Sequence, residues 1–231
     1  MVAQLFAHDA LYAYWDGQGD ETAERTVVVG REPIRAALAA NSALRPVTHV
    51  SVRDVENWFV EGSLVTASGC AVATFATSAQ LDATGQISRC LAFHCPPVAP
   101  SGNSKEAVPG DGRAILERYL DHLVAGELVA ASQCFSADCL YSHPPYAPGT
   151  PRVEFRGREE LLRGFRWTRS PSPSRHELVG SVQRGADCFI EGVVEGPAGP
   201  KGSFVSSASL DGDGLIRRYV AFYTSSRIPR R

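Results

Sequence analysis

The chain has 231 residues, of which 44% are hydrophobic and 21% are charged, and its formal net charge at pH 7 is −2. This composition is typical of a globular protein with one large domain or two small ones, and it gives no electrostatic case for binding nucleic acid. No apolar run approaches the roughly 20 residues that cross a bilayer, and the N-terminus lacks the pattern of a secretory signal. We therefore expect a cytoplasmic protein with no membrane or nucleic-acid partner.

The six cysteines are spread along the chain and include no CxxC pair. Paired spacing is the usual signature of a structural zinc site, and a chain of this length does not need disulfides to hold a core together. We therefore predict that the cysteines are small buried hydrophobic residues. No metal or other cofactor is expected.

The first half of the sequence predicts a mixture of helix and strand. Ile34 and Leu38 lie one helical turn apart, and the turn DATG at residues 82–85 leads into a strand. The predicted elements of this half are the end of a helix and a strand at 2–12, a helix at 31–40, and strands at about 49–59, 63–78 and 86–95.

A stretch rich in proline, glycine and serine separates the two halves. PPVAPSGNSKEAVPGDG begins at Pro96 and has neither helical nor strand periodicity, which is typical of a linker. We predict a first domain over residues 1–96, a linker over 97–110 and a second domain over 111–231.

The second half begins with a stronger helix signal. Asp111 is a suitable N-cap, apolar residues recur at helical spacing from Ile115 onward, and Gly126 ends the helix. A double proline, Pro144-Pro145, follows the next strand. The predicted elements are helices at about 114–124, 127–135 and 158–167, and strands at about 139–143, 176–183, 188–194, 203–210 and 215–224.

The two halves repeat each other. FAHDALY, which begins at Phe6, matches FSADCLY, and SAQLDATGQISRCLAF matches SASLDGDGLIRRYVAF. The separation is the same in both cases, because 138 − 9 and 211 − 82 both equal 129. Two separated matches at one offset predict a duplicated domain. Nothing in the first half matches the helix at 114–124.

The order of helix pair, strand, helix and antiparallel meander indicates an α+β cone. ERYLDHLVAGEL, the F-x-A-D-x-x-x-Y run that leads to His143, and LDGDGLIRRYVAFY together resemble the NTF2-like superfamily. Within it they resemble the SnoaL-like polyketide cyclases and the ketosteroid isomerases. The resemblance implies two tandem NTF2-like cone-shaped folds, the first lacking its N-terminal helix.

The resemblance also implies roles for two residues. Tyr119 lies where the isomerases keep the tyrosine that donates a hydrogen bond to the developing oxyanion, and His143 lies where they keep the aspartate that moves the proton. The second oxyanion donor of those enzymes is an aspartic acid, and Ser206 takes its position here, so steroid isomerisation is not expected. Alternatives remain open: Tyr119 as a core tyrosine, and His143 as a strand-end residue that caps backbone groups.

Glu191 is the third candidate catalytic residue. It lies in the predicted strand DCFIEGVVEG, and if Phe189 and Val193 point into the cone, strand alternation directs Glu191 there as well. It would then act as a second acid or base, or orient His143. If the alternation has the opposite phase, Glu191 lies in solvent instead.

Further residues are predicted to line a substrate pocket in the second half. In the first half Tyr14 takes the place of His143 and Ser68 that of Glu191, so the pocket is expected in the second half alone. The first half would then act as a partner subunit in an intrachain pseudo-dimer, or the chain would form a homodimer. The predicted substrate-binding residues are Tyr141, Trp167, His176, Phe189, Ser206, Tyr219 and Tyr223.

The resulting hypothesis is a cofactor-independent acid/base lyase or isomerase of cyclase type. Its substrate would be a small, largely apolar metabolite, such as a polyketide-like intermediate of secondary metabolism. A non-catalytic binding or assembly module is the alternative from another functional class. An epoxide hydrolase of the limonene type is a third possibility, but it needs an Asp–Arg–Asp cluster, and the sequence shows none at positions predicted to face inward.

Overall fold

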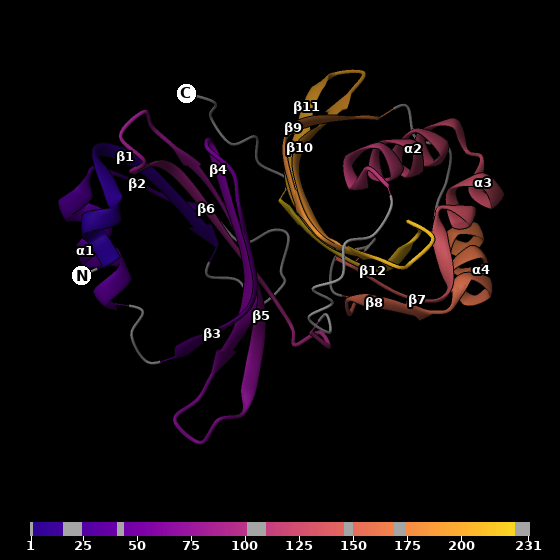
Figure 1. Ribbon diagram of the computed structural model, residues 1–231, viewed down its shortest axis with the longest axis horizontal. Helices are drawn as coiled ribbons and strands as arrows, with labels where there is room; N and C mark the ends of the chain where they lie inside the picture. Colours follow the sequence, from indigo (N-terminus) through magenta and orange to yellow (C-terminus); the bar gives the residue numbers. More distant parts are fainter. Residues whose placement is uncertain are drawn as a thin grey trace.

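The computed structural model describes residues 2–15, 25–40, 44–100, 110–145, 150–168 and 174–224. These residues form two curved six-stranded sheets, each with its helices on one face. The sheets pack back to back, so that the helices of the two halves lie on opposite outer sides (Figure 1). This architecture confirms the predicted α+β class with two tandem cones.

Both sheets have the same strand order. It is β2-β1-β6-β5-β4-β3 in the first half and β8-β7-β12-β11-β10-β9 in the second, so each strand has a counterpart. β1 and β6 are parallel, and so are their counterparts β7 and β12. The shared topology agrees with the duplication predicted from the repeated motifs.

The first half contains η1 (Val2–Leu5), β1 (Phe6–Trp15), β2 (Arg25–Val29), α1 (Arg31–Ala40), β3 (Arg45–Arg53), β4 (Asn57–Val65), β5 (Ala71–Leu81) and β6 (Ile87–Cys95). The second half contains α2 (Gly112–Ala125), α3 (Leu128–Gln133), β7 (Phe135–His143), β8 (Val153–Arg156), α4 (Arg158–Thr168), β9 (Arg175–Arg184), β10 (Asp187–Gly196), β11 (Gly199–Leu210) and β12 (Ile216–Thr224). In the described part of the first half, no helix corresponds to α2. Within the described residues, every helix is too short or too polar to cross a membrane.

Two predicted strands of the first half are each divided by a turn. The carboxylate of Asp54 accepts hydrogen bonds from the backbone N–H groups of Glu56 (2.8 Å) and Asn57 (2.6 Å), so the predicted strand at 49–59 becomes β3 and β4. Gly69 adopts a φ of 86°, which favours glycine, and the turn there separates β4 from β5. The short edge strands β2 and β8 were not predicted from the sequence.

The predicted linker is only partly described, because residues 101–109 lie outside the described ranges. Its first residues are tied to the folded halves. The Val98 N–H donates to Thr74 Oγ1 (2.8 Å), and the Ala99 carbonyl accepts a hydrogen bond from Arg218 Nε (2.9 Å). The chain is therefore anchored to both halves just after β6.

The two halves meet through an apolar layer between their sheets. The Phe59 ring packs against Phe189 with centroids 5.6 Å apart, and Phe93 packs against Phe222 at 6.4 Å. Each ring contacts its own counterpart, because 189 − 59 is 130 and 222 − 93 is 129. Such contacts between equivalent residues are the pattern of a two-fold interface.

Two buried ion pairs cross the same interface in reciprocal fashion. Arg218 on β12 donates two hydrogen bonds to Glu61 on β4, at 2.9 and 2.6 Å, and Arg89 on β6 lies 2.8 Å from Glu191 on β10. Glu61 corresponds to Glu191 and Arg89 to Arg218, since each glutamate precedes a glycine and each arginine lies in the repeated end motif. Both pairs have side chains no more than 6% exposed.

The N-cap of α2 is as predicted. The Asp111 carboxylate accepts hydrogen bonds from the backbone N–H groups of Arg113 (2.9 Å) and Ala114 (3.2 Å), and Gly126 ends the helix in the left-handed conformation with a φ of 74°. These signals fix the length of the helix that carries Tyr119.

Replacing Asp111 by alanine should lower the free energy of unfolding by about 1 kcal/mol, because two N–H groups lose their acceptor. Urea denaturation followed by circular dichroism measures the change. Asp121→Ala, an exposed position in the middle of the same helix, should shift it by less than about 0.5 kcal/mol. Equal losses for both variants would contradict the capping role.

Candidate active site

The inner face of the C-terminal cone carries a cluster of buried hydroxyl groups. The Tyr119 hydroxyl, on α2, donates to the Tyr141 hydroxyl on β7 at 3.2 Å, and Ser206 Oγ on β11 lies 2.9 Å from the Tyr219 hydroxyl on β12. All of these side chains are at most 3% exposed. Tyr141 and Tyr219 are register neighbours on paired strands, and their rings stack 5.4 Å apart.

His143 extends this cluster toward the end of β7. Its ring stacks on Tyr141 with centroids 5.9 Å apart and an interplanar angle of 1°. Its Nδ1 atom lies 2.7 Å from the Pro144 carbonyl oxygen, which can only accept, so Nδ1 carries a proton and Nε2 is the basic nitrogen of the neutral ring. The structure thus brings Tyr119 and His143 to one face of the cone, with Tyr141 between them.

The strand register places His143 level with Ser206, with Ala221 of β12 between them. Ser142 pairs with Val220, so His143 lies level with Ala221, and Ala221 pairs with Ser206 on the next strand. Across β12 this is two strand spacings, or about 10 Å. The imidazole and the serine therefore occupy one row of the sheet, and Tyr141 and Tyr219 occupy the adjacent row.

Aromatic rings pack tightly around Tyr119. Its ring centroid lies 5.0 Å from Phe135, 5.4 Å from Tyr219 and 6.3 Å from Phe165. These contacts fix the direction of the phenol. They also fill much of the described cone around it with side chains.

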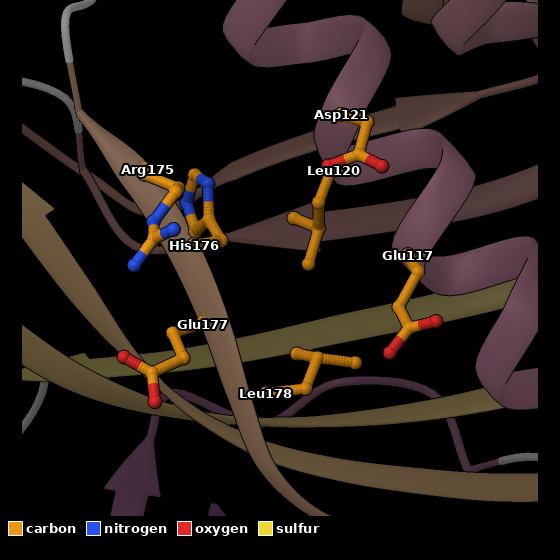
Figure 2. Close-up of a pocket in the computed structure, with 7 residues that line it drawn as sticks. All are labelled: Glu117, Leu120, Asp121, Arg175, His176, Glu177 and Leu178. Atoms are coloured by element: carbon orange, nitrogen blue, oxygen red, sulfur yellow. The ribbon is translucent and has the colours of Figure 1, made fainter.

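An open groove of about 520 Å³ lies between α2 and β9 (Figure 2). Its apolar wall is formed by Leu120, which belongs to the core of the cone, and Leu178, which packs against that core. The predicted substrate-binding residue His176 lines the groove, and its ring meets Phe204 edge-on at 5.6 Å. The remaining lining residues are charged: Glu117, Asp121, Arg175 and Glu177.

The groove brings three carboxylates and an arginine together, and a limonene-type hydrolase site would require two carboxylates and an arginine. Glu117 already pairs with Arg113 at 2.8 Å, and its side chain is 43% exposed. Among the described residues, Arg175 forms no ion pair with Glu117 or Asp121. These residues lie on a solvated rim, whereas activation of a water molecule benefits from an enclosed site.

Glu191 and Phe189 do not face the cone, which corrects their predicted roles. The alternation along β10 has the opposite phase, so both residues point into the interface between the halves. Glu191 accepts hydrogen bonds there from Arg89 (3.1 Å) and from Ser78 Oγ (2.5 Å). It is 4% exposed, so the alternative of a solvated glutamate is wrong as well.

Two other predicted pocket residues lie apart from the hydroxyl cluster. Trp167, near the end of α4, is 90% exposed. The Tyr223 hydroxyl donates to the Lys201 carbonyl oxygen at 3.1 Å, while its partly buried ring packs against the core. Neither residue is therefore part of the group of side chains around His143.

In the first half, the position that matches His143 is occupied by a tyrosine, Tyr14. Tyr14 stacks on Tyr12 with centroids 5.2 Å apart, as His143 stacks on Tyr141. Ser68, however, is not the counterpart of Glu191. That counterpart is Glu61, since 191 − 61 is 130 and each glutamate precedes a glycine, whereas the predicted match to Ser68 implied an offset of 123.

All six cysteines are free; five are buried, as predicted, whereas the prediction is wrong for Cys70, which is exposed. Burial raises the pKa of Cys139, on the inner face of β7, to about 11, so it stays a neutral thiol at pH 7. No group of three or more potential metal ligands occurs within the described ranges.

Asp187 gives the interface a dependence on pH. Burial raises its pKa to about 6 from 3.8, so the folded chain holds this proton more tightly than the unfolded chain. Its contribution to stability is therefore full below about pH 4 and is lost as the pH rises through about 6.

Asp187→Asn should raise the free energy of unfolding by about 1 kcal/mol at pH 7.5, a value reduced because the group is partly solvated. At pH 4 it should have little effect. Urea titrations at the two pH values measure the difference, with Asp213→Asn on an exposed turn as the control. A gain that is the same at both pH values would contradict the assignment.

A family model for the SnoaL-like domain matches residues 116–224. These residues form a SnoaL-like domain. The match spans the part of the chain from the middle of α2 to the end of β12, including Tyr119, His143 and the groove. No protein with a curated description matches the sequence.

Several solved structures are similar to about half of this chain. A provisionally named isomerase of the SnoaL-like family from Agrobacterium tumefaciens is 18% identical, with a TM-score of 0.40, over 48% of this chain and 96% of its own. A provisionally named polyketide cyclase from Sinorhizobium meliloti is 20% identical, with a TM-score of 0.37, over 48% and 99%. A protein with a ketosteroid isomerase-like fold from Catenulispora acidiphila, solved with trimethylamine, is 15% identical, with a TM-score of 0.40, over 51% and 88%.

Proposed function

We propose that the SnoaL-like domain catalyses proton transfer on a small, largely apolar carbonyl compound, as an isomerase, cyclase or lyase without a cofactor. The observation that carries this proposal is the contact between a phenol and an imidazole. Tyr119 and Tyr141 form a hydrogen-bonded pair of buried phenols, and the Tyr141 ring stacks on the imidazole of His143. One kind of group can stabilise an oxyanion, and the other can move a proton near pH 7.

The reaction would begin with removal of a proton from the carbon next to the substrate carbonyl. Nε2 of His143 accepts this proton, and the electron pair of the C–H bond moves to give an enolate. The Tyr141 hydroxyl, whose oxygen accepts a hydrogen bond from Tyr119, donates a hydrogen bond to the enolate oxygen. The imidazolium then returns the proton to another carbon. Alternatively, the enolate carbon attacks a second carbonyl group within the same molecule, and the imidazolium protonates the alkoxide that forms.

Two further features support a substrate of this kind. The Ser206–Tyr219 hydrogen bond holds a second pair of hydroxyls in the same face of the cone. The groove between α2 and β9, which is not lined by Tyr119, Tyr141 or His143, reaches the apolar core at Leu120 and Leu178, and its volume of about 520 Å³ suits a small metabolite. We propose that the first half acts as the built-in partner of this domain, which the reciprocal contacts between the halves support.

Deuterium exchange provides a test that does not require the natural substrate. The purified chain is incubated in D2O with small enolisable ketones such as β-tetralone and acetylacetone, and deuterium uptake is followed by NMR. We expect the wild type to accelerate uptake by at least one ketone. The absence of acceleration across a broad panel of ketones would overturn the proposal.

Replacing Tyr119 by phenylalanine should slow this exchange about tenfold, less than the loss of a sole oxyanion donor, because Tyr141 remains. The repeat supplies a matched control. Tyr12 is the counterpart of Tyr141 in the first half, so Tyr141→Phe should slow exchange while Tyr12→Phe leaves it unchanged. Similar rates for the three variants would contradict the assignment of the site to the second half.

A non-catalytic ligand-binding or assembly module is the second candidate function. It is favoured by the packing of Phe135, Phe165 and Tyr219 around Tyr119, which occupies space that a substrate would need. A bound ligand that contacts the groove but neither His143 nor Tyr119, together with no deuterium uptake, would support this function instead.

A further inference from the structure

Arg152 lies behind the strand that carries His143. It precedes β8, and its Nε donates to Ser142 Oγ at 2.7 Å. Its Nη2 donates to the carbonyl oxygen of Ser142 at 3.2 Å and also to the carbonyl oxygen of Ala221. One guanidinium therefore holds the backbone of both β7 and β12.

These bonds occur where the pairing of the two strands stops. The last register pair between β7 and β12 joins Ser142 to Val220. The next residues along the strands are His143 and Ala221, and Arg152 joins the strands at this point with side-chain donors in place of a backbone ladder. The planar fork of arginine suits this task, because its donors point in fixed directions.

The guanidinium is itself held in place. Its central carbon lies 5.5 Å from the centroid of the Phe222 ring, in a cation–π arrangement. Phe222 in turn packs against Phe93 of the first half. The group that braces β7 is thus supported by the interface between the halves.

We infer that Arg152 is a positioning residue, which fixes the end of β7 so that the His143 imidazole stays stacked on Tyr141. This inference rests on the proposed function of His143. Arg152 does not touch the inner face of the cone through any of these bonds, and its effect passes through Ser142 to the next residue.

The test compares Arg152→Met and Arg152→Lys with Arg158→Met. Arg158 is a matched control, because its Nε donates to the Phe135 carbonyl at 2.8 Å, at the opposite end of the same strand. With the ketone that exchanges fastest, we expect Arg152→Met to lower kcat about tenfold and to change KM less than twofold. Arg152→Lys should recover part of the loss, and Arg158→Met should leave kcat unchanged.

A second measurement separates this inference from the proposed function. The ring signals of His143 are assigned in NMR spectra by their loss in His143→Gln. Arg152→Met should shift these signals, and Arg158→Met should not. Unshifted signals in Arg152→Met would overturn the positioning role, as would a loss of kcat of equal size in both variants. Exchange that survives in His143→Gln would instead overturn the proposed function, while the signal shift still decides the role of Arg152.

If Arg152→Met does not fold, Ser142→Ala provides a milder variant. It removes only the Oγ acceptor of Arg152 Nε and keeps the guanidinium in the protein. The same shift of the His143 signals is expected, with a smaller amplitude. Signals identical to those of the wild type would count against the inference.

Discussion

Replacing Arg218 by alanine should lower the free energy of unfolding by about 3–5 kcal/mol, because it leaves the carboxylate of Glu61 buried without its counter-ion. The Glu61 side chain is fully buried, and both of its oxygens accept hydrogen bonds from Arg218, at 2.9 and 2.6 Å. The third donor of Arg218 binds the Ala99 carbonyl. The substitution therefore removes a counter-ion and three hydrogen bonds together.

The neighbouring arginine provides the control for this prediction. Arg217 is 62% exposed in its side chain and lies 3.8 Å from Asp138, so Arg217→Ala should cost less than about 1 kcal/mol. Urea denaturation at pH 7.5 measures both variants. A loss below about 1 kcal/mol for Arg218→Ala would show that water or another group compensates Glu61 after the substitution.

The second ion pair, Arg89–Glu191, permits the same test with the arginine in the first half and the glutamate in the second. Arg89→Ala leaves Glu191 with the Ser78 hydroxyl as a hydrogen-bond donor. It should therefore lower the free energy of unfolding somewhat less than Arg218→Ala does. Removing both members of one pair, as in Glu61→Leu with Arg218→Met, should cost less than Arg218→Ala alone, because no buried charge remains unpaired. The difference measures how much of the loss comes from the isolated carboxylate.

His143→Ala should reduce deuterium exchange by about 10²–10⁴-fold, the range for loss of a general base. The effect should exceed that of Tyr119→Phe, because Tyr141 remains as a hydroxyl donor beside Tyr119, while no second imidazole stacks on Tyr141 among the described residues. Initial rates of uptake in D2O measure the change, and circular dichroism verifies the fold.

The repeat again supplies the matched control. Tyr14 occupies the position of His143 in the first half, since 143 − 14 is 129, and it stacks on Tyr12 in the corresponding way. Tyr14→Ala should therefore leave the exchange rate unchanged. A wild-type rate in His143→Ala would remove this residue from the mechanism, and a loss in Tyr14→Ala would place the reaction in the first half.

Most of the fold could be predicted from the sequence because its signals are local. The N-cap at Asp111, the glycine at 126 and the repeated end motifs each act over a few residues, and the structure agrees with them. The Asp54 turn was missed because its side-chain acceptor has no glycine or proline beside it. The edge strands β2 and β8 have only 5 and 4 residues, too few to show alternation.

The orientation of Glu191 could not be predicted because β10 is apolar on both faces. Cys188 and Ile190 pack toward the helices, whereas Phe189 packs toward the first half. A strand buried on both sides shows no contrast between an inner and an outer face, so alternation alone does not give its phase. A pseudo-dimer was expected, but the sequence did not indicate that the first half would cover this side of β10 and bury Glu191 there.

The roles of Tyr119 and His143 remain predictions, but the family resemblance implied that both lie on one face of the cone, and the structure places them there. Arg152 could not be found in this way. Its partners, Ser142 and Ala221, lie 10 and 69 residues away in sequence, and two of its three acceptors are backbone carbonyls, which any residue type supplies. A contact of this kind leaves no pattern in the sequence.

The reciprocal interface has a consequence for how the two halves can change. Because both sides of the contact belong to one polypeptide, each half meets its mate at an effective concentration that dilution does not lower. Association between separate subunits would instead weaken as the protein became scarce. A substitution on the helix-covered face of one sheet also need not occur on the other. One gene can therefore keep the interface residues in both halves while the inside of only one cone changes.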